Sequence, residues 1–464
     1  MLRINAGISC SLITLVAVVP SAMADMAATN STDVAPPSQP WQKPAWLTDL
    51  SAGAHQGYDN NLLLVSGNGL APEQSWITTI SGRVGFDVAP LIGAQSPVKA
   101  LTLVYAPDFN IYQNASQESY DAHRVLNFIR FAEGNFSFSL TNAFLYNDGS
   151  RTAPIYAESQ LPGGNSNDKF RNFYAQAAPR ERRDQIQDRS IVSFQYGWDN
   201  FFVRPTASLL YYDLNTILYN AAVAPFIGYQ NWPDRYDVNG GVDGGYKVTP
   251  ALAVTLGYRY GYQYQAQFPL SISADRHFSS STYQRVLAGV EGNLWSWLSI
   301  KLAAGPDFRD YNPMAAVNNS HDIFPYVEAT VTANITPYQT LTFATREWQW
   351  VASTGLVPYY DSNYLLTYHW SATPKFGLDL LGKILEADFT SGNDFAGTAP
   401  SLRNDIQYGI GIGATYSFTE NLSANVVYNF NLGRNLLDNL PAKYAPSYRN
   451  FSESFASLGL QYAF

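Results

Sequence analysis

The sequence predicts an all-β protein, a single antiparallel up-and-down transmembrane β-barrel of about 18 strands, with roughly 16 to 18 strands as the plausible range. Three observations lead to this fold class. Hydrophobicity alternates with a period of two along most of the chain, short and long connections alternate between the extended runs, and the composition is rich in aromatic and poor in charged residues. A strand with this period has one apolar face and one small or polar face, as a wall between lipid and water requires.

Composition narrows the class of protein further. The chain has 464 residues and is 46% hydrophobic, yet beyond the N-terminus no run of ~18 apolar residues occurs, so spanning helices are not expected. Aromatic residues (15%) outnumber charged ones (14%), which suits an uncharged outer wall with aromatic girdles. The net charge of −9 argues against a nucleic-acid partner. The single cysteine, Cys10, lies in the expected leader, which leaves the mature chain without a disulfide framework or a zinc–thiolate site, and no metal or cofactor is expected.

The N-terminal residues have the pattern of a secretory leader. Arg3 supplies the positive charge, an apolar core runs through Leu12–Val19, and Ala22-Met23-Ala24 has the small-x-small spacing of a cleavage site. The following segment is rich in Pro, Ser, Ala and Thr and is expected to be a disordered lead-in. The predicted divisions are a signal peptide at 1–24, the lead-in at 25–45 and one barrel domain at 46–464.

From there the chain reads as extended runs of about ten to fifteen residues. The first nine expected strands are Leu47–Asp59, Trp76–Val88, Thr102–Tyr112, His123–Ala132, Phe136–Asn147, Ile186–Tyr196, Phe201–Tyr212, Tyr236–Lys247 and Leu252–Tyr264. The next nine are Tyr283–Leu294, Leu298–Arg309, Ile323–Ile335, Thr340–Trp350, Tyr360–Ser371, Phe376–Leu385, Asp405–Phe418, Leu422–Gly433 and Arg449–Phe464.

Alternation within these runs is clearest in Leu252–Tyr264, where every second residue is Leu, Val or Tyr and the residues between them are small or polar. Short connections repeat one chemistry, as in Thr249-Pro250, Thr336-Pro337 and Thr373-Pro374, where Pro suits a tight turn and not a central strand. Long connections rich in Asn, Ser, Gly and Pro fall between them. In a bilayer all backbone polar groups need partners, so such strands can span only as a closed barrel.

The chain end has a recognisable pattern. Ser457-x-Gly459-x-x-Tyr462-x-Phe464 resembles the C-terminal signal by which Gram-negative outer-membrane β-barrels are recognised for insertion. The chain as a whole resembles the poorly characterised β-barrel porin families, including those found with exopolysaccharide loci. The resemblance implies that Gly459, Tyr462 and Phe464 form the insertion signal. It also implies a location in the bacterial outer membrane after Sec-type export, with outer-membrane lipids, lipopolysaccharide, the barrel-assembly machinery and periplasmic chaperones as partners.

A barrel of this size is too wide for side chains to fill, so a water-filled passage is expected. Charges on its wall would orient and filter polar solutes, or would form solvated ion pairs that hold the wall together. The strand phase places these residues on the lumen side: Arg83, Arg189, Arg204, Arg259, Arg285, Lys301, Lys383, Asp237, Asp243, Glu291, Asp307 and Glu328.

The longest connection, Asp148–Gln185, is basic. It resembles the inward-folded loop of porins in position and length, and as a constriction it would favour anionic or sugar-like solutes. Alternatively it stays at the surface, where its arginines meet lipopolysaccharide phosphates. The residues concerned are Lys169, Arg171, Arg180, Arg182 and Arg183.

The expected function is an outer-membrane, porin-like channel for passive passage of small hydrophilic solutes or saccharides. Two alternatives stay open: an exopolysaccharide export or secretion accessory barrel, and a barrel enzyme or a structural barrel with a closed lumen. No enzymatic activity is expected, because none of the five histidines sits in a motif that pairs it with a nucleophile. An aromatic-lined lumen would favour export, a charged constriction a porin, and a His–Ser/Asp cluster an enzyme.

Overall fold

The computed structural model describes residues 43–62, 74–93, 95–150, 183–213, 234–266, 279–313, 317, 319–351, 358–392, 401–437 and 450–464. The predicted leader at 1–24 lies outside the described residues, as does nearly all of the lead-in. The first strand begins at Leu47 and the last ends at Ala463.

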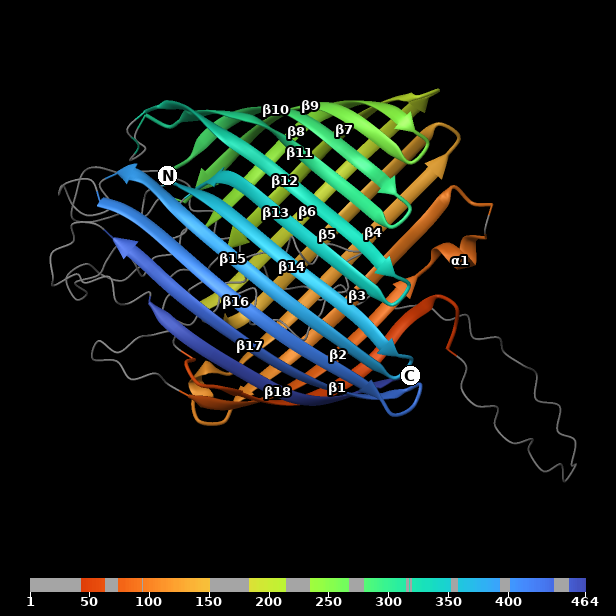
Figure 1. Ribbon diagram of the computed structural model, residues 1–464, viewed down its shortest axis with the longest axis vertical. Coiled ribbons are helices and arrows are strands. Elements are labelled where there is room, and N and C mark those ends of the chain that lie inside the picture. Colours follow the sequence, from red (N-terminus) through yellow and green to blue (C-terminus); the bar gives the residue numbers. More distant parts are fainter. Residues whose placement is uncertain are drawn as a thin grey trace, which may run out of the picture. The chain divides into compact units, whose positions relative to one another are not determined.

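Eighteen strands make up almost all of the described chain (Figure 1). The first nine are β1 (Leu47–Asp59), β2 (Ser75–Asp87), β3 (Val98–Tyr112), β4 (Tyr120–Glu133), β5 (Phe136–Ser150), β6 (Arg183–Trp198), β7 (Phe201–Asp213), β8 (Arg235–Thr249) and β9 (Leu252–Gln265). The others are β10 (Ser281–Trp295), β11 (Leu298–Tyr311), β12 (His321–Thr336), β13 (Gln339–Trp350), β14 (Tyr359–Thr373), β15 (Phe376–Gly392), β16 (Ser401–Ser417), β17 (Leu422–Leu437) and β18 (Phe451–Ala463). Each coincides with one predicted run, with ends that differ by a few residues.

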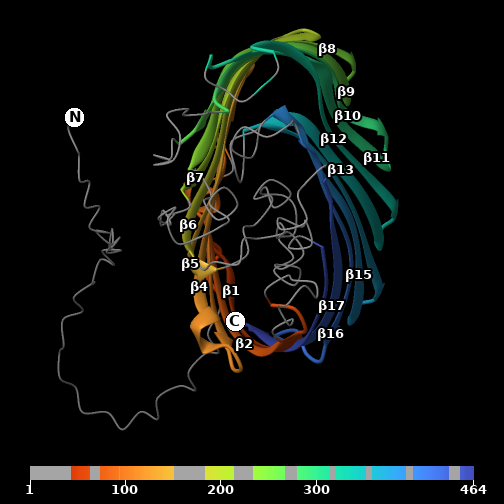
Figure 2. The same cartoon turned by 90° about the vertical axis from the view of Figure 1, so that its left-hand side faces the viewer.

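The sheet closes on itself. Every strand pairs antiparallel with its neighbours in the chain, and β1 pairs with β18 from Ser51 opposite Ala463 to Asp59 opposite Phe455. Figure 2 shows the strands surrounding the interior as a ring. The prediction of a closed all-antiparallel barrel of 18 strands is confirmed.

The two faces of the strands separate as the period of two predicts. In β9 the side chain of Leu256 is 64% exposed on the outer face, whereas Gln263 is fully buried on the inner face. In β17 Val426 is half exposed, and its lumen-facing neighbours Asn425 and Asn429 are buried. The interior is therefore lined by the polar half of the alternation.

Short connections gather at one end of the barrel, the right-hand end in Figure 1. Threonine side chains close four of these turns. The hydroxyl oxygen of Thr373 accepts hydrogen bonds from the backbone N–H groups of Lys375 (3.2 Å) and Phe376 (3.0 Å), and Thr419 does the same for Asn421 and Leu422. Thr249 and Thr336 each accept one such bond. The hydroxyl thus supplies a local acceptor that fixes the turn, which explains why Thr recurs there.

Two short helices were not anticipated from the sequence. The helix α1 (Ala89–Ile92) lies in the connection between β2 and β3 at the short-turn end, and a 3-10 turn at Ser116–Glu118 connects β3 to β4. Pro90 in the first turn of α1 has the position in which proline best fits a helix. Among the residues that the structure describes, no helix has the length and hydropathy needed to cross a membrane.

Candidate functional site

Most of the predicted lumen residues meet at one cavity. Its volume is about 500 Å³, and the residues that line it come from strands between β5 and β15. Nine of the twelve predicted residues line it: Arg189, Arg204, Arg259, Arg285, Lys301, Lys383, Asp243, Glu291 and Glu328. The interior polar wall that the strand phase predicted is therefore present, and it is concentrated around this space.

The other three predicted residues lie elsewhere on the inner face. Arg83 lines a smaller cavity of about 90 Å³ beside β1, β2 and β18 and forms an ion pair with Asp49. Asp237 and Asp307 are both buried. Asp237 accepts hydrogen bonds from the Tyr283 hydroxyl, and Asp307 binds two arginines.

One network on the cavity wall is balanced in charge. Arg204 binds both carboxylate oxygens of Glu291, at 2.7 and 2.8 Å, and also contacts Asp243 at 3.2 Å. Arg259 reaches the other oxygen of Asp243 at 2.7 Å. These four side chains come from β7, β8, β9 and β10 and form an ion-pair cluster that ties the four strands together. Such a cluster is the alternative that the sequence analysis gave to charges that filter solutes.

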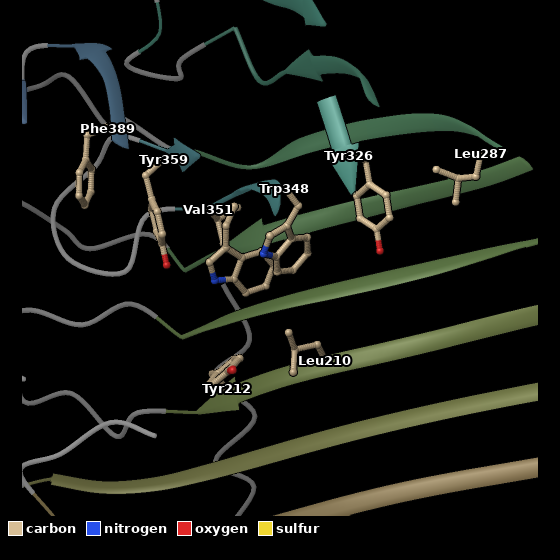
Figure 3. Packing of buried hydrophobic residues seen from close by; sticks show 9 residues of the cluster. Leu210, Tyr212, Leu287, Tyr326, Trp348, Val351, Tyr359 and Phe389 are labelled. Atoms are coloured by element: carbon tan, nitrogen blue, oxygen red, sulfur yellow. The ribbon is translucent and has the colours of Figure 1, made fainter. Parts of the chain in front are cut away.

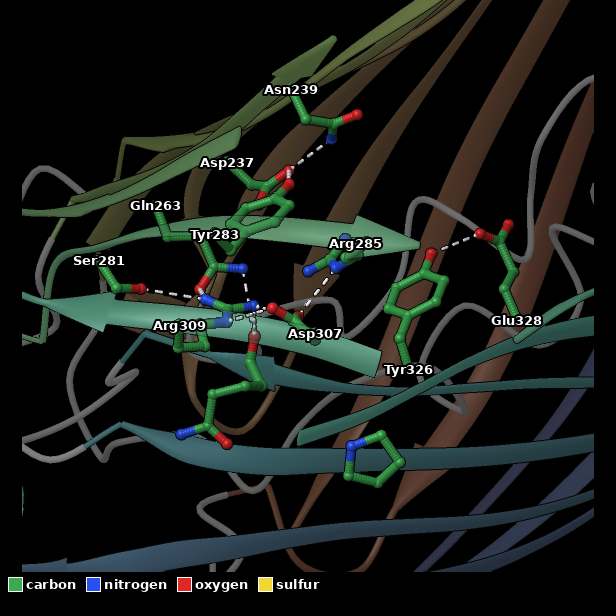
Figure 4. Close-up of polar contacts among 12 residues, drawn as sticks. Asp237, Asn239, Gln263, Ser281, Tyr283, Arg285, Asp307, Arg309, Tyr326 and Glu328 are labelled. Atoms are coloured by element: carbon green, nitrogen blue, oxygen red, sulfur yellow. Dashed lines mark hydrogen bonds and ion pairs between the residues drawn. The ribbon is translucent and has the colours of Figure 1, made fainter. Parts of the chain in front are cut away.

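A second, buried network centres on Arg309, a residue that the sequence prediction did not include (Figure 4). Its guanidinium donates to both oxygens of Asp307, to Gln263 (2.6 Å) and to Ser281 (3.1 Å). Arg309 and Asp307 are completely buried, and Arg285 donates to the same carboxylate at 2.8 Å. A buried charge is tolerated only when it is paired and its donors are used, and this cluster meets that condition.

The Arg309 network stabilises an irregularity in the strand pairing of the barrel wall. The pairing of β12 with β13 stops at Val327 opposite Glu347, although β12 continues to His321 and β13 to Trp350. Pro325 lies in the stretch of β12 that β13 leaves unpaired, and it has no N–H to donate to a neighbour.

Beyond this point the end of β13 turns into the interior. Trp348, Gln349, Trp350 and Val351 are all buried, whereas a regular strand would expose every second one. The carbonyl of Gln349 accepts hydrogen bonds from Arg309 of β11 (2.8 Å) and Gln263 of β9 (3.2 Å). The interior at this level is therefore partly occupied by the barrel's own strand end.

An aromatic cluster packs around that strand end (Figure 3). The ring of Trp350 lies 6.4 Å from that of Tyr212 on β7, and the ring of Trp348 stacks on Trp350 at 4.4 Å. The Arg235 guanidinium lies 5.0 Å from the Tyr212 ring and 5.3 Å from the Trp350 ring, distances at which a cation is attracted to the ring face. The buried members of this cluster are Leu210, Tyr212, Leu287, Tyr326, Trp348, Trp350, Val351, Tyr359 and Phe389.

The large cavity of about 500 Å³ is basic. Of the described side chains that line it, seven are Lys or Arg and three are Asp or Glu, a surplus of four positive charges in a chain whose formal net charge is −9. Arg346 of β13 is one of the seven and is missing from the sequence prediction, although the alternation along β13 already placed it on the inward face with Trp348.

The predicted constriction residues Lys169, Arg171, Arg180 and Arg182 lie outside the described residues, so that hypothesis stays a prediction. Arg183 is the first residue of β6, where its backbone pairs with Ser150.

In the predicted insertion signal, Tyr462 and Phe464 are half exposed and in edge-to-face contact at 4.8 Å. Gly459 faces inward against His55: a Cβ there would lie 2.0 Å from the imidazole Nδ1.

A hydrogen-bonded Ser–His–Asp chain lies on the inward face of the β14–β15 hairpin, near the short-turn end. His369 Nδ1 is 2.7 Å from Asp379 Oδ1, and His369 Nε2 is 3.1 Å from Ser371 Oγ. The sequence prediction missed it, because His369 and Ser371 are two residues apart and match no nucleophile motif. Over the described ranges, no group of three or more His, Cys, Asp or Glu residues could hold a metal ion.

Comparison with known proteins gives similarity only at the level of structure. No protein-family model matches the chain, and no curated protein is similar to it in sequence. The siderophore receptor PiuA from Acinetobacter baumannii is 11% identical, with a TM-score of 0.42 over 90% of this chain and 82% of that one.

Two Pseudomonas aeruginosa proteins are similar to the same degree. OccK3 (OpdO) is 11% identical, with a TM-score of 0.38 over 90% of this chain and 95% of its own. OccK2 (OpdF), whose structure is a complex with glucuronate, is also 11% identical, with a TM-score of 0.39 over 90% of this chain and 98% of its own. Such low identity and superposition carry no information about function.

The role of Arg309 can be tested by its removal. Arg309→Met would remove the Arg309 donors to Ser281 and Gln263, and would leave the Gln349 carbonyl with Gln263 alone and Asp307 with Arg285 alone. We expect a loss of about 3 kcal/mol in the free energy of unfolding, the cost of breaking a buried ion pair. Denaturant unfolding of the refolded barrel, followed by tryptophan fluorescence, measures it. Lys301→Met is the control, since Lys301 is exposed to the cavity and its loss should change stability little. A loss below about 1 kcal/mol for Arg309→Met would contradict the stabilising role of the Arg309 network.

Proposed function

We propose that this protein spans the bacterial outer membrane as a barrel channel for passive passage of small hydrophilic solutes. The observation that carries the proposal is the combination, in one closed wall, of an apolar outer face with a charged cavity inside. Each strand has at least 12 residues, more than the ~9–11 that a tilted strand needs to cross a bilayer. Closure leaves no sheet edge in lipid, apart from the short stretch of β12 that β13 releases.

The outer face supports a membrane location. Large aliphatic side chains such as Ile80, Leu256, Ile410 and Leu458 are half to two-thirds exposed there, which would be unfavourable for a soluble protein. Aromatic side chains gather on the outer surface near the short turns, as in an interfacial girdle. They include Tyr196, Trp198, Phe201, Trp295, Trp297, Tyr338, Trp370, Tyr416, Phe418, Tyr462 and Phe464. The insertion-signal role of Gly459, Tyr462 and Phe464 belongs to the same proposal.

The cavity supports passage of polar solutes. Its lining is mainly Arg, Lys, Ser, Thr, Asp and Glu, groups that water can solvate and that can exchange hydrogen bonds with a passing solute. The basic surplus attracts anions and repels cations through the focused field of a narrow passage.

The export alternative is less well supported. A polymer sliding through a lumen needs exposed aromatic faces, but Tyr212, Trp348, Trp350 and Tyr359 are at most 4% exposed and pack against each other and against arginines. Within the described part of the chain, the accessible inner wall is charged rather than aromatic.

A specific observation favours the enzyme alternative, namely the Ser371–His369–Asp379 chain, which has the hydrogen-bond order of a hydrolase triad. Acyl transfer also needs donors for the oxyanion. The N–H of Ser371 is already donated to the Tyr338 carbonyl at 2.8 Å, and the neighbouring strand N–H groups are used in sheet pairing. We therefore propose that the protein is not an enzyme.

The hydrolase alternative has a direct test. We expect no hydrolysis of p-nitrophenyl esters by the refolded barrel above the uncatalysed rate, because the oxyanion would be left without donors. The wild type and Ser371→Ala should give the same rate. An activity present in the wild type and lost in Ser371→Ala would establish the enzyme and overturn this part of the proposal.

The membrane location predicts that a charge on the outer face is costly. Ile410 lies in the middle of β16 and is 61% exposed, so Ile410→Arg should lower the free energy of unfolding from lipid vesicles by about 2–4 kcal/mol. Thr330→Arg is the matched control, because Thr330 is also exposed but lines the inner cavity, where water can solvate the new charge. Equal effects of the two substitutions would argue against a lipid-facing outer wall.

The channel itself is tested by conductance. In planar bilayers the refolded protein should open stable steps, with a reversal potential under a salt gradient that shows anion preference. Lys301→Gln combined with Lys383→Gln removes two of the seven basic groups at the cavity and should move that potential toward cations. Lys375→Gln, in the β14–β15 turn and exposed, should leave it unchanged. A folded barrel that conducts no ions would overturn the channel proposal.

A further inference from the structure

We infer that the large cavity contains a binding site for the carboxylate group of an anionic solute, and that Arg285 is the residue that binds it. This inference rests on the proposed function and names the class of solute that the passage selects. It is based on the contacts that fix the Arg285 side chain and on the guanidinium nitrogen that has no hydrogen-bond acceptor among the described residues.

Arg285 is fixed in a single plane. Its guanidinium carbon lies 3.9 Å from the centre of the Tyr283 ring on one side and 4.3 Å from that of Tyr326 on the other (Figure 4). Its Nε donates to Asp307 at 2.8 Å, and Asp307 is in turn held by Arg309. A guanidinium that is stacked and anchored in this way loses little conformational entropy when it binds a ligand.

The opposite edge of the same group is not used. Arg285 is 3% exposed, and its Nη2 is buried with no hydrogen-bond partner among the described residues. A buried N–H without an acceptor is unfavourable, and more so when it belongs to a charged group. Because Arg285 also lines the cavity, an acceptor that enters the cavity can satisfy this donor.

Other basic groups converge on the same space. Arg189 comes from β6 and Arg346 from β13, on the other side of the interior, and the two are close enough for their charges to repel. The Arg346 guanidinium stacks on Trp348 at 3.7 Å, and Arg285 lies 5.8 Å from the same ring. Cations brought together in this way are stabilised when an anion enters between them.

Acidic groups offset this charge only in part. Glu328 faces Arg189, Arg346 and Lys301 and accepts a hydrogen bond from the Tyr326 hydroxyl at 2.8 Å. Asp307 and Asp237 face Arg285 and Arg309. Among the described residues the neighbourhood holds five basic groups (Arg189, Arg285, Lys301, Arg309, Arg346) and three acidic ones (Asp237, Asp307, Glu328), a surplus of two.

A carboxylate fits the geometry best. The planar edge of a guanidinium matches the two oxygens of a carboxylate in a pair of parallel hydrogen bonds, which a lysine ammonium cannot reproduce. The polar wall around it, with side chains such as Ser208, Asn239 and Thr330, offers hydrogen bonds to hydroxyl groups on the rest of the solute. A hydroxylated acid is therefore the class of solute expected.

Calorimetric binding of gluconate to the refolded full-length barrel in detergent tests the site without relying on conductance. The wild type should bind gluconate and should bind its neutral counterpart sorbitol at least about tenfold more weakly, since one charge-assisted pair is worth that factor or more. Arg285→Lys keeps the charge and the partner of Asp307, and it should weaken gluconate binding about tenfold or more. Arg259→Lys is the matched control, because Arg259 lines the same cavity but is paired with Asp243, and it should change the affinity little.

Each outcome separates the two proposals. Equal affinity in Arg285→Lys and Arg259→Lys, with both variants folded by circular dichroism, would overturn the Arg285 site, and so would equal binding of gluconate and sorbitol. Inorganic phosphate that binds more tightly than gluconate would overturn the carboxylate assignment. Gluconate bound through Arg285 by a barrel that carries no current would support the site and overturn the channel, whereas open steps without gluconate binding would do the reverse.

Discussion

Closure of the sheet between β1 and β18 is the constraint on which the rest of the structure depends. With β1 and β18 paired, the backbone N–H and C=O groups of the wall find partners within the sheet, except where β13 parts from β12, and the outer surface need contribute few polar groups. That in turn permits an outer face of Leu, Ile, Val and aromatic residues over 18 strands. Many of the charged side chains of the strands then lie on the inner face, as at the large cavity.

Inside the barrel, the arginines have different roles. Arg204 and Arg259 are tied to Glu291 and Asp243 across four strands and hold the wall together. Arg309 is used completely, with its donors shared among Asp307, Gln263, Ser281 and a carbonyl of β13. Arg285 has its plane fixed and one edge unused. The first group ties the strands together, and the last is the residue that we propose binds a solute.

The inward turn of β13 connects these two roles. By leaving β12 at Val327, the strand end brings Trp348 and Trp350 across the interior toward β7, which narrows the space above the cavity. The same step places Arg346 and Trp348 beside Arg285. In the channel that we propose, a narrow basic passage at this level concentrates the field that a diffusing anion meets, so the element that narrows the interior is also the one to which we assign the selectivity.

Local pattern was enough to predict the wall. The period of two located every strand, placed Leu256 and Leu458 outside and Gln263 inside, and predicted a barrel of 18 strands, because which face a side chain occupies is a property of the extended chain itself. It also assigned twelve charged residues to the lumen side, and nine of these line one cavity.

The pattern could not predict which side chains become neighbours across the interior. Arg309 finds Gln349 forty residues later, and Arg189 meets Arg346 from the far wall, contacts that exist only once the ring has closed. Periodicity describes a regular strand, so it could not predict that β13 parts from β12 after Glu347 while it stays paired with β14, because that departure depends on donors from β9 and β11. The wall follows from short-range alternation, and the constricted basic interior follows from which remote side chains closure brings face to face.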